Sequence, residues 1–174
     1  MENENVENEK VTTRSIGIRF GLYGALARIL LFAIAIVLNV NAFDGPVAWT
    51  GMVVGLVLIV LAHRQFKNDG NGYMDYGQGV GIGFWMGLVG TLIVVPIMYV
   101  YLNFIDSAPF DLFLEKQEET MIARGTPEQA IEMAMKWTKN IFWPMAVIGG
   151  ILGSVIFALI ISIFTKKSNP EMSI

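Results

Sequence analysis

The sequence predicts an all-α integral membrane protein: a bundle of four transmembrane helices with an extracytoplasmic helical hairpin between the third and fourth. Hydrophobic residues make up 54% of the 174 residues and charged residues only 16%, whereas a soluble protein carries about a quarter charged residues. A bilayer core about 30 Å thick needs ~20 helical residues. Four apolar stretches reach or approach that length, at about 16–40, 46–62, 80–101 and 141–164.

These spans leave no room for a separate soluble domain of ordinary size, which defines the predicted domain organisation. Residues 15–167 form a single four-helix membrane domain. Residues 1–14 are polar and rich in Glu and Asn, a composition that predicts a disordered cytoplasmic tail. Residues 168–174 form a second cytoplasmic tail.

The positive charges predict the orientation of the spans. The segments before span one, between spans two and three, and after span four are short and basic, whereas the loop over 41–45 has no Lys or Arg. Short basic loops stay in the cytoplasm. Both termini are therefore expected to be cytoplasmic. The basic residues on that side are Lys10, Arg14, Arg19, Arg64, Lys67, Lys166 and Lys167.

The long segment between spans three and four has helical features of its own over about 109–139. Helix formers continue up to Gly125, a typical residue after a helix end. Thr126 then suits the N-cap of a second helix, with Pro127 in its first position. We expect a helical hairpin against the outer membrane surface. The alternative is a solvated acidic loop.

Glycines at four-residue spacing predict where the spans pack closely, because small residues let helix backbones approach each other in lipid. The third span is richest in glycine and is expected to be central, with a bend at Pro96. The predicted helix-packing residues are Gly51 and Gly55 in span two, Gly79, Gly83 and Gly87 in span three, and Gly149 and Gly153 in span four.

Arg28 is the candidate functional residue within the membrane. If the first span ends at residue 40, Arg28 lies ~10 Å inside the hydrocarbon, where a charge is costly. One interpretation is that its side chain reaches back to the cytoplasmic phosphates. The other is contact with an anion or a lipid head group. No acidic residue lies within a span, and the nearest polar residues in predicted depth are Asp75 and Gln78.

No catalytic, cofactor-binding or metal-binding site is predicted. The chain has no cysteine, which excludes disulfides, thiol nucleophiles and thiolate metal ligands. His63 is the only histidine and adjoins Arg64, so it is expected to be a polar cap at the membrane interface. The carboxylates around Glu115 are expected to form a solvated helix face, with loose divalent-cation binding as the alternative.

Three short motifs resemble a family of bacterial inner-membrane proteins catalogued as domain of unknown function 4199. They are KNDGNGYMDYGQ at 67–78, YLNFID at 101–106 and FLE at 113–115. The resemblance extends over roughly 14–167 and implies a multi-pass protein of the bacterial cytoplasmic (inner) membrane. It supplies no activity.

These observations favour a non-enzymatic integral membrane protein with a packing, interaction or membrane-organising role. Its expected partners are the lipid bilayer and either itself or another membrane protein, with no nucleic acid and no cofactor. The alternative function is a small transporter or channel component that acts as a homo-oligomer, in which Arg28 contacts an anion or lipid head group.

Overall fold

The computed structural model describes residues 11–169, which form five α-helices and no strand in that part of the chain. The helices are α1 (Thr13–Val37), α2 (Gly45–Asp69), α3 (Tyr76–Phe104), α4 (Ala108–Ala123) and α5 (Glu128–Thr165). All except α4 are long and apolar enough to cross a membrane. The all-α fold with four candidate spans is therefore confirmed. Of the two predicted tails, 1–10 and 170–174 lie outside the described residues.

Local capping explains where the first and third helices begin. Thr12 and Ser15 form a reciprocal capping box at the start of α1. Asp75 and Gln78 do the same for α3, where the Asp75 carboxylate accepts the Gln78 N–H at 2.7 Å. These side chains satisfy backbone donors that the first helical turn leaves free. Asp75 and Gln78 therefore have a structural role at the helix end.

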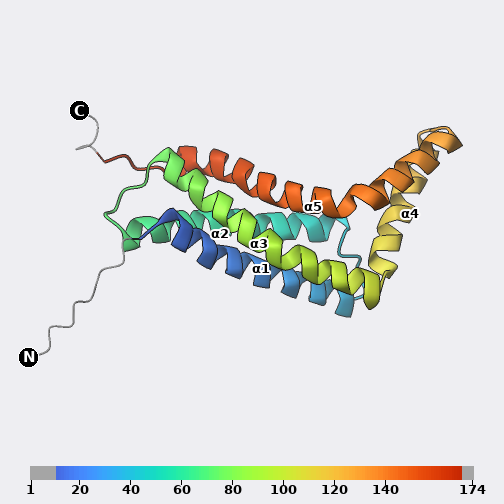
Figure 1. The fold of residues 1–174 in the computed structure, drawn as a ribbon, viewed down its shortest axis with the longest axis horizontal. Coiled ribbons are helices and arrows are strands. Elements are labelled where there is room, and N and C mark those ends of the chain that lie inside the picture. Colours follow the sequence, from blue (N-terminus) through green and yellow to red (C-terminus); the bar gives the residue numbers. More distant parts are fainter. Residues whose placement is uncertain (1–10, 170–174) are drawn as a thin grey trace, which may run out of the picture.

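Helix α3 lies between α1 and α5 (Figure 1), as the glycine pattern predicts. A Cβ built at Gly83 would collide with the Cβ of Ala158 and lie 3.2 Å from the Ser154 carbonyl oxygen. A Cβ at Gly87 would lie 2.6 Å from the Cβ of Ser154. On the other side of α3, a Cβ at Gly21 of α1 would lie 3.0 Å from the Cβ of Val89. The close contacts of α3 with α5 and with α1 therefore both depend on glycines, which have no side chain.

Helix α2 covers one face of the layer formed by α1, α3 and α5, and the tightest packing lies at one end of it. The buried cluster draws on the start of α1, the end of α2, the turn before α3, the first half of α3 and the last part of α5. Its members are Ile16, Phe20, Ile59, Ala62, Phe66, Met74, Ile82, Met86 and Ala158. We call this the core end of the bundle. Met74 also pairs with Lys167 through two backbone hydrogen bonds of 2.9 and 2.8 Å, which ties the α2–α3 turn to the chain after α5.

At the opposite end, α4 and the first part of α5 project from the bundle (Figure 1). They are joined by a turn in which Gly125 has φ +71°, which explains the preference for glycine there. The prediction of Thr126 as N-cap is wrong, because Pro127 occupies that position without a side-chain cap. The second arm of the predicted hairpin and span four form one continuous helix, α5, which passes through Pro144. The side of the membrane on which this region lies stays a prediction.

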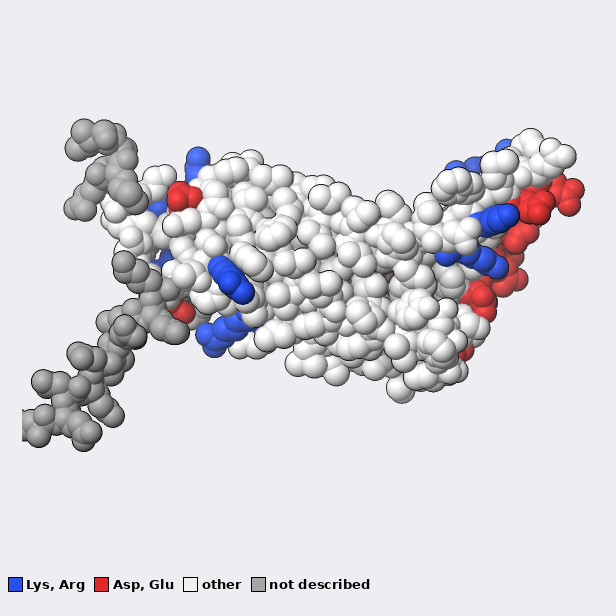
Figure 2. All heavy atoms as spheres, viewed as in Figure 1, with Lys and Arg blue, Asp and Glu red and all other residues white. Residues whose placement is uncertain are grey.

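The charged residues gather at the two ends of the molecule. On the face drawn in Figure 2, a broad belt without Lys, Arg, Asp or Glu separates the core end from the projecting helices, where the acidic residues gather. Each spanning helix has at least 25 residues, or ~37 Å at 1.5 Å per residue, which exceeds the hydrocarbon thickness. The belt and the helix lengths fit a multi-pass membrane protein.

The glycine contacts of α3 generate the first prediction. Gly83→Ala places a methyl group against Ala158 and should destabilise the bundle by about 1–3 kcal/mol, the usual cost of overpacking. Gly51→Ala is the matched control, because no described atom lies within 4 Å of the position that its Cβ would take. Thermal unfolding in detergent, followed by tryptophan fluorescence, should show a lower midpoint only for Gly83→Ala. Equal midpoints would contradict a close α3–α5 contact.

Candidate functional site

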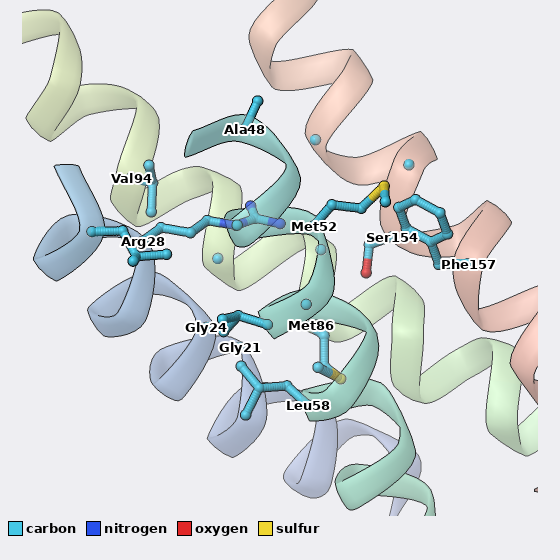
Figure 3. A pocket seen from close by; sticks show the side chains of 18 of the residues that line it. Gly21, Gly24, Arg28, Ala48, Met52, Leu58, Met86, Val94, Ser154 and Phe157 are labelled. Atoms are coloured by element: carbon cyan, nitrogen blue, oxygen red, sulfur yellow. The ribbon is translucent and has the colours of Figure 1, made fainter. Parts of the chain in front are cut away.

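A cavity of about 390 Å³ lies between α2 and the other three spanning helices (Figure 3). Its walls are almost entirely aliphatic, aromatic or glycine, and its volume falls in the range of small-molecule sites. Residues from α1 include Gly24, Arg28 and Phe32, those from α2 include Ala48, Gly51, Met52, Gly55 and Leu58, those from α3 include Met86, Gly90, Val94 and Met98, and those from α5 include Gly149, Gly153, Ser154 and Phe157.

Glycines create this space where α2 and α5 face each other. A Cβ added at Gly51, Gly149 or Gly153 would have no described atom within 4 Å, and one added at Gly55 would meet only an Arg28 nitrogen at 4.0 Å. Within the described chain these four residues line the cavity, so the prediction that they pack helices together is corrected. Gly79, Gly83 and Gly87 do lie against α5. The difference arises because α2 stays apart from α5 at this level.

Arg28 is the one charged residue in the cavity lining. Its side chain extends from α1 across the cavity towards α2 (Figure 3), where it reaches the level of Gly55. Among the described residues it has neither a hydrogen bond nor an ion pair. Since a guanidinium carries five N–H donors and stays protonated, the cavity holds a permanent cation whose donors lack protein partners.

Arg28 also lies deeper than the sequence suggests. It follows the start of α1 by 15 residues and precedes the end at Val37 by nine, which places it ~14 Å from that end at 1.5 Å per residue. In Figure 3 the α3 residue beside it is Val94, which lies far along the helix from Asp75 and Gln78. The sequence-based placement near the inner end of α3 is therefore wrong. It assumed that the apolar span ends at Val40 and that the hydrocarbon begins about 20 residues earlier, whereas α1 ends at Val37.

The other polar side chain of the lining, that of Ser154, already makes a hydrogen bond within the bundle. The Ser154 hydroxyl donates to the Gly83 carbonyl oxygen at 2.8 Å. Beneath the lining, Thr91 is buried against Gly150, and its hydroxyl has no partner within the described chain. No carboxylate lines the cavity. The charge balance of the site is therefore one-sided and favours an anion.

The loop between α1 and α2 lies at the end of the cavity that faces α4. Ala42 contributes to the lining, while its neighbours bind the projecting helices. The Asn41 side chain donates to the Pro109 carbonyl oxygen at 3.2 Å, and Asp44 pairs with Lys116 at 2.6 Å. The Phe43 ring lies among three phenylalanine rings of α4 and α5, those of Phe110, Phe113 and Phe142, at centroid distances of 6.2, 5.4 and 5.9 Å. We call residues 41–44 the loop tether.

At the core end, His63 joins α2 to two other helices. Its Nδ1 lies 2.8 Å from the Thr165 hydroxyl and its Nε2 lies 3.0 Å from the Gly79 carbonyl oxygen. A neutral ring with its proton on Nε2 donates to the carbonyl. It accepts from the Thr165 hydroxyl when the single hydroxyl proton points to the ring rather than to the Ile161 carbonyl oxygen, which lies 2.9 Å away. Lys67 adds a bond to the Thr165 carbonyl oxygen at 2.8 Å. These residues form what we call the histidine clamp.

The prediction of His63 as an interfacial polar cap is therefore corrected, since the side chain is fully buried. Its position at the end of an apolar run next to Arg64 suggested the interface. However, α2 continues as a helix to Asp69, which carries the true helix end beyond the histidine. The signal that sequence reasoning missed is that Gly79, already a predicted packing residue, leaves its carbonyl accessible to a facing donor.

Two acidic residues of the outer segment make local hydrogen bonds at the start of α4. Ser107 donates to the Asp111 carboxylate at 2.7 Å, and Asp106 accepts the N–H of Ala108 at 2.9 Å, so both carboxylates help to start α4. Within residues 11–169, no group of three His, Asp or Glu is arranged to hold a metal ion. The cavity around Arg28 is thus the strongest candidate site.

The family model for DUF4199, described as a protein of unknown function, matches residues 19–167. The chain belongs to this family. The match includes α1 from Arg19 onward, the other three spanning helices, the histidine clamp and Arg28, and it confirms the resemblance carried by the turn before α3. Searches of curated proteins and of solved structures returned no match.

The histidine clamp generates the second prediction. His63→Leu removes both ring hydrogen bonds and should lower the free energy of unfolding by about 1–3 kcal/mol, since buried partners then lose their contacts. Arg64→Leu is the control, because the neighbouring side chain is exposed. Unfolding in mixed micelles with increasing denaturing detergent measures the difference. A His63→Leu variant as stable as Arg64→Leu would exclude a stabilising clamp.

Proposed function

We propose that this DUF4199 protein is a non-enzymatic membrane protein that binds an anionic ligand at Arg28, within the cavity between α2 and the other spans. The observation that carries the proposal is the unpartnered guanidinium in an apolar cavity. Carboxylate and phosphate groups fit it best, because they accept two parallel N–H bonds from one guanidinium. Binding of this kind suits a carrier or a receptor for such ligands.

Without a ligand, the charge of Arg28 costs free energy inside a bilayer. Insertion scales place the cost of an arginine near the centre of a spanning helix at about 2.5–3.5 kcal/mol. Arg28 does not lower that cost with a carboxylate from the lining or a hydrogen bond from the described chain. An anionic ligand would satisfy the donors and neutralise the charge. Ligand binding therefore accounts for a residue that the fold does not require.

This proposal gives priority to the alternative that the sequence left open. A role through packing alone would be supported by an interior filled by close glycine contacts. Such contacts occur between α3 and its neighbours, but Gly51, Gly149 and Gly153 face open space. Interaction with a second copy or another membrane protein stays part of the proposal as an assembly around the binding site.

We place the protein in a bacterial cytoplasmic membrane with both termini on the cytoplasmic side. The distribution of basic residues supports this orientation, because Arg64, Lys67 and Lys167 gather at the core end with the start of α1. The projecting helices would then be extracytoplasmic. In this orientation Arg28 lies nearer the outer surface, at ~14 Å from the end of α1 by helical rise.

The third prediction tests the role of Arg28 by separating binding from folding. Arg28→Met should leave expression unchanged and have a higher thermal midpoint than ligand-free wild-type protein, because it removes an unpaired charge from an apolar cavity. Acidic compounds that co-purify with the wild-type protein should be absent from this variant. Arg28→Lys, which keeps the charge but lacks the planar fork, should retain part of them. Organic extraction and negative-ion mass spectrometry measure the content.

Arg64→Met is the matched control, since it removes an exposed positive charge from the core end. Its extract should resemble that of the wild type. A poorly expressed or strongly destabilised Arg28→Met would assign Arg28 a structural role and overturn the proposal. An unchanged profile of acidic compounds in a stable Arg28→Met would overturn it as well.

A further inference from the structure

We infer that the ligand is a single-chain amphiphile with one carboxylate or phosphate head, which enters sideways from the bilayer between α2 and α5. This inference rests on the proposed function and narrows its ligand class. It depends on three observations: the apolar lining, the position of the gap, and the packed residues at the two ends of the cavity.

The lining selects against a small hydrophilic anion. Such an ion is surrounded by water, and stripping that water away is costly unless several polar groups replace it. Here Arg28 is the single cation, and the Ser154 hydroxyl is bonded to Gly83. The remaining side chains, which include Phe20, Leu58 and Phe157, offer only apolar contact. A ligand with one anionic group and a hydrocarbon chain matches this pattern.

The gap between α2 and α5 supplies the entrance. The two helices are held together at the core end, where His63 and Lys67 bind Thr165. Further along, no described atom lies within 4 Å of a Cβ added at Gly51 or Gly153. The lining residues Ala48 and Gly149, one from each helix, are exposed. This opening is on the side of the bundle, where a membrane places lipid chains rather than water.

Packed residues lie at both ends of the cavity. The histidine clamp and the buried cluster fill the core end. The loop tether covers the other end, with Ala42 in the lining and Phe43 fixed among the rings of α4 and α5. Arg28, which is exposed in the bundle without lipid, is therefore reached most directly from the side of the bundle, through the bilayer. The cavity of about 390 Å³ accommodates a head group and part of one chain, and the rest of the chain can extend through the gap into lipid.

The fourth prediction uses the full-length protein in phosphatidylcholine nanodiscs, with hexadecyl phosphate and palmitate as probes. Both should raise the unfolding midpoint of the wild-type protein and bind at micromolar concentration. Hexadecanol has the same chain without the charge, and inorganic phosphate and acetate have the charge without the chain. These three should bind at least tenfold more weakly. Arg28→Met should lose the binding of both amphiphiles.

A second pair of variants tests the entrance. Gly153→Leu fills the gap without a clash at its Cβ, so it should weaken amphiphile binding at least tenfold while keeping the unfolding midpoint of the free protein. Leu152→Phe adds bulk to the exposed face of the same helix and should bind normally. Normal binding to Gly153→Leu would overturn lateral entry between α2 and α5.

The outcomes separate this inference from the proposed function. Binding of inorganic phosphate or acetate that depends on Arg28, without tighter binding of the amphiphiles, would overturn the ligand class and leave anion binding at Arg28 intact. Equal binding of hexadecanol and hexadecyl phosphate would show that the head-group charge is irrelevant. If no probe depends on Arg28, both the inference and the proposed function fail.

Discussion

The close approach of α3 to both α1 and α5 is the constraint on which the rest of the structure depends. Without side chains at Gly83 and Gly87, the backbones of α3 and α5 meet at contact distance, and Gly21 of α1 does the same on the other side. In lipid, such contact replaces the water exclusion that holds soluble helices together. Three helices thereby form one layer, and α2 is left to cover a single face of it.

The position of α2 decides where the layer is sealed and where it is open. At the core end, large side chains such as Ile59 and Phe66 fill the space against the layer, and His63 adds directional hydrogen bonds. Further along, α2 presents glycines to the glycines of α5. Glycine strengthens an interface only when the two backbones can approach. Where other contacts hold the helices apart, the same residues leave a void.

This dependence explains which parts of the molecule the sequence could predict. The four spans follow from composition, and the central place of α3 follows from the density of its glycines. Neither argument needs the distance between helices that are remote in the sequence. The role of Gly51 and the environment of His63 do need it. The first depends on how far α5 lies from α2, and the second depends on Thr165 of α5. Nor could helix propensity alone place the start of α5, since Pro127 and Thr126 are both acceptable caps and the final geometry depends on the turn at Gly125.

The combination of features around Arg28 is hard to explain by stability alone. An apolar void forgoes packing contacts, and an unpaired charge beside it adds a desolvation cost. Leucine at position 28 and alanine at positions 51 and 153 would reduce both costs, and the space for those methyl groups is present. Local departures from the most stable sequence are expected at functional sites. In this molecule two such departures meet in one cavity between α2 and the other spanning helices. That coincidence makes the cavity, rather than the glycine contacts of α3, the place where the function should be sought.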